Sequence, residues 1–171
     1  MLEYLIPLIV FSGLILGVIL AKVSPEEMKS GERYFKILKK ITLTILIISL
    51  IFLAIPLFLE LILGLVVGYI AALLLKRVYF FLGLALFLSF LTSIPDLILL
   101  FSSIVFIFGL PTGSLIASEV KKKKDLYLSM ILNAIFFLSP FLLFFIRDLL
   151  ANNLAFPLAF TAGSLLYIIR Y

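Results

Sequence analysis

The feature that most constrains this chain is the length of its apolar runs. Ile41 to Leu75 and Val78 to Ala117 are each about twice as long as a membrane-spanning helix, which needs about 20 apolar residues. Hydrophobic residues make up 65% of the chain, and its mean hydropathy is +1.36. A soluble core of 171 residues cannot hide that much apolar surface from water. We therefore predict an all-α integral membrane protein.

Two interruptions divide the double-length runs. Pro56 and Glu60 interrupt the first run, and the segment from Thr92 to Asp96 interrupts the second. We interpret each interruption as a tight turn between two spans. The chain then forms a single polytopic membrane domain, 1–171, with seven transmembrane helices. They are predicted near residues 5–21, 38–58, 60–75, 78–93, 97–118, 126–146 and 154–169.

The basic residues fit this count, because they sort to one side of the membrane. Of the 14 Lys and Arg residues, only Arg147 falls on the opposite side when the connections alternate. The positive-inside rule then places the N-terminus outside and the C-terminus inside. Such sorting also argues against a basic groove, so no nucleic acid partner is expected. The start of the chain lacks the pattern of a cleavable signal peptide, which favours a multi-pass protein of a prokaryotic cell membrane.

Residues 22–40 form the one long connection, on the basic side. Ser24, Pro25 and Glu27 occupy the positions of a capped helix start, and Gly31 is typical of a helix end. Basic and apolar residues then alternate up to the second span. We predict a cytoplasmic capped helix followed by an amphipathic segment at the membrane interface. The lipid bilayer is therefore its first expected partner.

The composition excludes several classes of chemistry. The chain has no Cys and no His, which removes thiolate and imidazole metal sites, cysteine nucleophiles and histidine relays. Its carboxylates do not form the cluster that magnesium-dependent phosphotransferases need. We therefore expect no enzymatic activity, no cofactor and no metal.

Small residues four positions apart recur in the spans that run in the same direction. This spacing puts them on one helix face and lets two backbones approach closely. The predicted packing glycines are Gly13, Gly17, Gly64, Gly68 and Gly163. Helix packing alone explains the pattern. It also fits an internal duplication, a 3+1+3 parallel repeat in which the fourth span links two three-helix units.

Polar residues inside a bilayer are candidates for function because they are costly there. In the fifth span, Pro111 removes a backbone donor between two glycines. We predict a break or a kink in the helix at this point. Its hinge would consist of Gly109, Pro111 and Gly113.

The predicted ligand-binding residues are Thr112 and Ser114 in the fifth span and Asn133 in the sixth. They would face the second span across a narrow polar cleft. Two structural interpretations stay open, since the hydroxyls can bond their own helix and the amide can join neighbouring helices. Glu60, in a hairpin at the outer end of the third span, is a candidate to carry a proton or cation.

Two functions follow from these features. The first is a carrier or permease for a small solute or lipid, through the cleft at the fifth helix. The second is a non-catalytic accessory or assembly subunit, in contact with a partner membrane protein. In a carrier the glycine faces pack spans of one chain together, whereas in a subunit Gly64 and Gly68 would face outward. A homo-oligomer is compatible with both.

The last third of the chain resembles the second half of the SWEET and PQ-loop sugar transporters. The residues that carry the similarity are Pro111, Lys121 to Lys124, Ser129, Asn133, Asp148, Pro157, Gly163 and Tyr171. The resemblance implies seven spans in a 3+1+3 arrangement, an outside N-terminus and sugar transport. The chain departs from that family because it has no Pro-Gln pair and because Leu158, not asparagine, follows Pro157.

Overall fold

The computed structural model describes residues 2–92, 94–120 and 122–170, and within them all secondary structure is helical. The α-helices are α1 (Leu2–Val23), α2 (Pro25–Ala54), α3 (Phe58–Leu75), α4 (Val78–Leu91), α5 (Pro95–Glu119), α6 (Lys123–Leu138), α7 (Arg147–Ala151) and α8 (Ala155–Ile169), and a 3₁₀ helix η1 (Ser139–Ile146) follows α6. Five helical segments are long and apolar enough to cross a membrane, and α4 and α8 are shorter apolar helices. The chain is thus an all-helical, multi-pass membrane protein.

Helical structure occupies each of the seven predicted spans, and most bounds differ by a few residues, apart from the start of α2 and the end of α6. The largest difference is in α2, which is one helix from Pro25 to Ala54. The prediction of a separate capped helix that ends at Gly31 is therefore wrong. Ser24 makes no side-chain capping hydrogen bond in the described part of the chain. Gly31 has no positive φ and lies inside the helix, which continues to Ala54.

The sixth predicted span is divided between α6 and η1. Pro140 lacks the N–H that would continue the α-helical pattern, and it lies at the start of the 3₁₀ helix. The Ser139 hydroxyl donates a hydrogen bond to the carbonyl oxygen of Phe136, at 3.0 Å. The chain therefore continues in a tighter 3₁₀ form over residues that the sequence predicts as one span.

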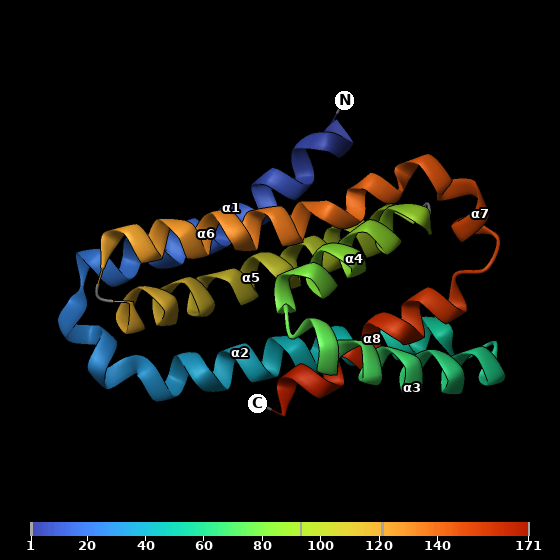
Figure 1. Cartoon of the computed structure of the whole chain (residues 1–171), viewed down its shortest axis with the longest axis horizontal. Coiled ribbons are helices and arrows are strands. Elements are labelled where there is room, and N and C mark those ends of the chain that lie inside the picture. Colours follow the sequence, from blue (N-terminus) through green and yellow to red (C-terminus); the bar gives the residue numbers. More distant parts are fainter. Residues whose placement is uncertain (1, 93, 121, 171) are drawn as a thin grey trace.

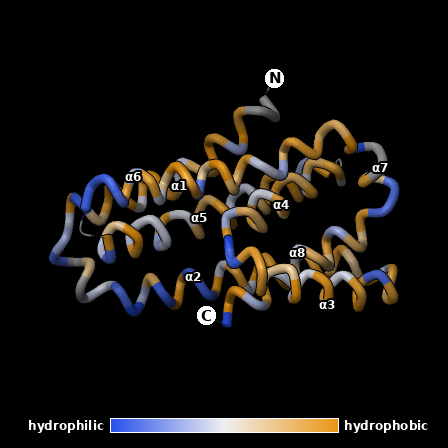
Figure 2. Tube along the Cα trace, viewed as in Figure 1, coloured by the Kyte–Doolittle hydropathy of each residue, from blue (hydrophilic) through white to orange (hydrophobic). Residues whose placement is uncertain are grey.

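The helices run mainly along the long axis of the molecule (Figure 1). The α1–α2 and α5–α6 connections lie together at the end that we call the basic end, and α7 lies at the opposite end. The start of α4 and the C-terminus lie partway along the axis. This follows from length, since α3 and α8 have 18 and 15 residues, or about 27 Å and about 23 Å, whereas α2 has 30, or about 45 Å. Figure 2 shows hydrophilic residues along the first half of α2.

Two closely packed helix pairs organise the fold: α1 packs along α5, and α3 packs along α8. Glycines make both contacts. A Cβ atom at Gly17 would overlap the backbone carbonyl of Leu110 in α5. In the second pair, a Cβ atom at Gly68 would overlap the backbone carbonyl of Phe160. Gly13, Gly64, Gly109, Gly113 and Gly163 meet the facing helix in the same way.

In each pair, a serine hydroxyl forms a hydrogen bond between the two helices at an equivalent place. The hydroxyl of Ser114 donates a hydrogen bond to the carbonyl oxygen of Gly17, at 2.8 Å. The hydroxyl of Ser164 does the same with the carbonyl oxygen of Gly68, at 2.9 Å. Each serine directly follows one of the contact glycines. The two pairs therefore use the same combination of close backbone contact and a hydrogen bond between helices.

The two pairs are joined by α2 and α4, which both pack against α5 and α8. Residues 81–89 of α4 are all buried, so this helix is enclosed on every side. A helix that is apolar all round is expected at such a central place. Gly83 gives α4 a close contact with α6, because a Cβ atom there would overlap the Phe137 carbonyl.

We expect Gly68→Ala to destabilise the protein, because the added methyl group must push α8 away from α3. Overpacking of this kind costs about 1–3 kcal/mol. The matched control is Gly31→Ala in α2, where a Cβ atom would meet only the Phe35 side chain. Because only a flexible side chain has to move at this half-buried position, the alanine should be neutral or stabilising by up to about 1 kcal/mol. Thermal unfolding in detergent measures both, and equal effects of the two substitutions would contradict the pair geometry.

Candidate functional site

A cavity of about 420 Å³ lies between α2, α5 and α8, toward the basic end. Three lysines of α2 line it, together with Thr112 and Glu119 of α5. The remaining lining is apolar and includes Leu43 and Ile168. It is bounded by helices of both pairs, since α5 belongs to the first pair and α8 to the second. The cavity therefore lies at the seam between them.

The charge of the cavity is positive. Its lysines are Lys36, Lys39 and Lys40. The last two follow Lys36 by three and four residues, so all three lie on one side of the helix. Glu119 interacts electrostatically with Lys36 and Lys39 across the cavity. Lys36 also forms an ion pair with Glu32, one turn earlier on α2. With three cations and one carboxylate in its lining, the cavity is suited to an anionic group.

Two buried hydroxyl groups, those of Thr112 and Tyr79, lie at the wall of the cavity. Thr112 is buried, and its hydroxyl donates a hydrogen bond to the carbonyl oxygen of Phe108, at 2.8 Å. The hydroxyl of Tyr79 is also buried and lies close enough to Thr112 to interact with it, although without a well-formed hydrogen bond. Aromatic rings hold the tyrosine, with Phe11 at 6.0 Å and Phe108 at 6.1 Å between ring centroids. This tyrosine thus places a buried and weakly bonded polar group next to the cavity wall.

The predicted ligand-binding residues do not lie together. Of the three, Thr112 lines the cavity, whereas Ser114 is buried against α1 through its bond to Gly17. Asn133 is half-buried on α6, which packs against α4 and η1 and does not border the cavity. A cleft formed by all three side chains is therefore not present in the described structure.

The prediction of a broken fifth helix is also wrong. The helix α5 runs without interruption from Pro95 to Glu119, with Pro111 inside it. Gly109 and Gly113, predicted as hinge residues with Pro111, face the backbone of α1 near Leu14. The glycines thus provide the flat surface on which α1 packs, and this contact accounts for their spacing.

Glu60 lies in the first turn of α3, at the end of the bundle away from the cavity. One carboxylate oxygen accepts a hydrogen bond from the Asn153 amide, at 3.4 Å. The other oxygen is buried and has no partner among the described residues. Its role as a carrier of a proton or cation stays a prediction. No group of three or more acidic side chains that could hold a metal occurs in the described chain.

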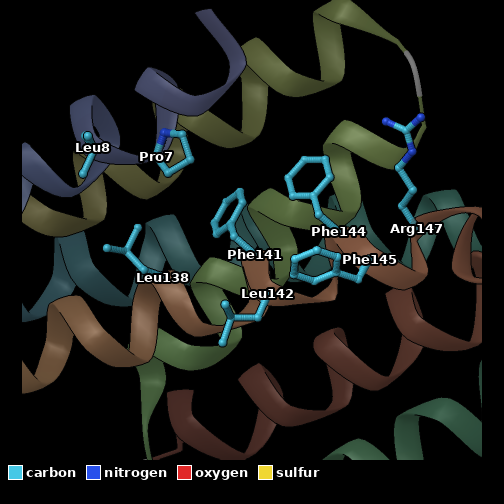
Figure 3. A pocket seen from close by; sticks show the side chains of 8 residues that line it. All are labelled: Pro7, Leu8, Leu138, Phe141, Leu142, Phe144, Phe145 and Arg147. Carbon is cyan, nitrogen blue, oxygen red and sulfur yellow. The ribbon is translucent and has the colours of Figure 1, made fainter. Parts of the chain in front are cut away.

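A second cavity, of about 520 Å³, lies between α1 and the α6–η1 segment. Figure 3 shows the rings of Phe141, Phe144 and Phe145 in its wall, with Arg147 at one side and Pro7 at the other. Apart from the arginine, its side chains are apolar. Few groups could therefore orient a polar solute there. The lysine-lined cavity is the better candidate for a functional site.

Comparison of the chain with protein families, curated proteins and solved structures finds no match. The similarity to SWEET and PQ-loop transporters therefore gains no support from these comparisons. The functional argument depends on the geometry of the chain itself.

The sequence analysis assigned no site role to five residues of this region. The three lysines belong to the segment predicted as amphipathic and interfacial, although their spacing is sufficient to put them on one helix face. Glu119 and Tyr79 were not singled out. The signal for Tyr79 is a hydroxyl group two residues after Arg77, at the start of a span that is otherwise almost entirely apolar.

We expect Ser114→Ala and Tyr79→Phe to affect stability differently. Ser114→Ala removes a hydrogen bond between helices and should cost about 0.6–1.7 kcal/mol. Tyr79→Phe removes a buried hydroxyl whose only weak interaction is with Thr112, so it should cost less than Ser114→Ala. Thermal unfolding of the two variants in the same detergent makes the comparison. A loss of stability in Tyr79→Phe as large as that in Ser114→Ala would mean that the hydroxyl is bonded.

Proposed function

We propose that this protein is a carrier whose ligand enters from the basic side, through the cavity between α2, α5 and α8. The supporting observation is the cavity itself, with three lysines and Thr112 in its lining. Its position at the seam suits a carrier, because a shift of one helix pair against the other would open or close it. Each pair could move as a unit, since close backbone contacts hold its helices together. The ligand would be a small anionic solute or a lipid.

The direction of the glycine faces favours a carrier over an accessory subunit. A subunit would use Gly64 and Gly68 to contact a partner, whereas both residues face α8 of the same chain. The pairing of α1 with α5 and of α3 with α8 also supports the parallel repeat. In a 3+1+3 arrangement, α1 and α5 are the first spans of the two units, and α3 and α8 are the last. The proposal retains an outside N-terminus, an inside C-terminus and a prokaryotic cell membrane, and it assigns no enzymatic step.

Cysteine labelling tests the proposal directly, because the natural chain contains no cysteine. Thr112 is buried but lines the cavity, which Ser89 does not, so we expect Thr112→Cys to react with a small membrane-impermeant thiol reagent applied from the cytoplasmic side. A carrier presents its site to both sides in turn, so slower labelling from the outer side is also expected. The control is Ser89→Cys, at a buried position in α4. It should react from neither side.

The outcomes separate the parts of the proposal. Labelling from the cytoplasmic side alone would indicate a binding site that does not alternate, and the carrier function would be wrong. Labelling from the outer side alone would reverse the proposed orientation. Absence of labelling from both sides would show that water does not reach the cavity.

A further inference from the structure

We infer that the ligand of the lysine-lined cavity is an anionic phospholipid, which enters sideways from the bilayer with its phosphate at Lys36, Lys39 and Lys40. This inference rests on the proposed function, since it names the ligand class of the same cavity. It is argued from the lining of the cavity, from the surface of α2 beside it and from the position of both in the membrane.

The lining of the cavity combines two kinds of surface. Three lysines provide cations, and half of the lining residues are apolar: Leu43, Leu115, Ile116, Ile168 and Ile169. A small inorganic anion would make no apolar contacts with this wall, and an uncharged lipid would make no ion pairs with the lysines. A ligand with a phosphate and an adjoining hydrocarbon portion matches both surfaces.

A shallow groove lies beside the cavity, on the outer surface of the bundle. Lys40 lines the cavity and also this groove along α2. The groove is otherwise formed by Ile37, Ile41, Thr44 and Ile45, and these isoleucines are 46%, 49% and 47% exposed. They belong to the segment of α2 that is apolar enough to cross a membrane. An acyl chain can therefore lie along the isoleucines while its phosphate reaches Lys40.

The remaining polar groups favour a headgroup that carries hydroxyls. Glu119 offers carboxylate oxygens at the cavity. The Thr112 oxygen can accept a hydrogen bond, since its own hydrogen is directed to Phe108. A glycerol headgroup supplies donors for both acceptors, so phosphatidylglycerol is the appropriate probe. The cavity volume of about 420 Å³ suits a headgroup, whereas the chains would remain in the groove and the bilayer.

The test compares two triple variants with equal loss of charge. In the site variant, Lys36, Lys39 and Lys40 are each changed to Gln. In the control, Lys122, Lys123 and Lys124 are changed to Gln; these lysines are exposed at the start of α6 and do not line this cavity. Native mass spectrometry of delipidated protein measures retention of phosphatidylglycerol and of phosphatidylcholine. A second site variant, Ile168→Phe, narrows the cavity and keeps every lysine.

We expect the natural chain to bind one phosphatidylglycerol at least about tenfold more tightly than phosphatidylcholine. The site variant and Ile168→Phe should lose this preference, and the control should keep it. An equal loss in the control would mean that lipid binds by surface charge alone, which would overturn the inference. Displacement of the lipid by equimolar glycerol phosphate or inorganic phosphate would identify a soluble phosphate as the ligand and would overturn it too.

These outcomes are distinct from failure of the proposed function. If Thr112→Cys is labelled from both sides but no phosphatidylglycerol preference is found, the carrier stands and the lipid ligand is wrong. If the preference is found but the cysteine is labelled from one side only, the lipid site stands and the carrier function is wrong.

Discussion

The structure depends on close contact between backbones at two places, α1 against α5 and α3 against α8. In a bilayer, helices gain little from the hydrophobic effect on association, because lipid chains are as apolar as leucine. Association must come from packing and hydrogen bonds. Glycines bring a carbonyl of one helix into the space that a side chain would fill on the other. At this separation a serine hydroxyl can reach the facing backbone, as Ser114 and Ser164 do.

The position of the cavity follows from how the two pairs are joined. Both α2 and α4 pack between α5 and α8, and α4 fills the centre with apolar side chains. Because α8 ends at Ile169, partway along the long axis, it does not accompany α2 and α5 to the basic end. The space that it leaves is lined by the lysines of α2 and by the last turns of α5. The open space is thus a consequence of unequal helix lengths, and the lysine spacing on α2 gives it a cationic lining.

Much of the fold could be predicted from the sequence, and the site only in part. Apolar runs located the spans, since spanning length and charged connections limit the choices, but they missed the start of α2 at Pro25 and the change from α6 to η1 at Ser139. The residues Gly109 to Ser114 show where local pattern was insufficient. A proline between glycines is compatible with a broken helix or with a flat packing surface. The deciding partner, Gly17, is 97 residues away from Ser114 in the chain. The lysines were likewise ambiguous until the end of α8 was placed beside them.

The most direct test of this account is the distance between spin labels within and between the two pairs. Cysteines at Ile19 in α1 and Ser118 in α5 report on one pair, and Ser118 with Leu74 in α3 reports across the seam; all three positions are exposed. In bilayers with and without phosphatidylglycerol, the account predicts a narrow, unchanged distance between Ile19 and Ser118. It predicts a shift between Ser118 and Leu74. An equal shift within the pair would contradict the account, because the close backbone contacts would not be holding those helices together.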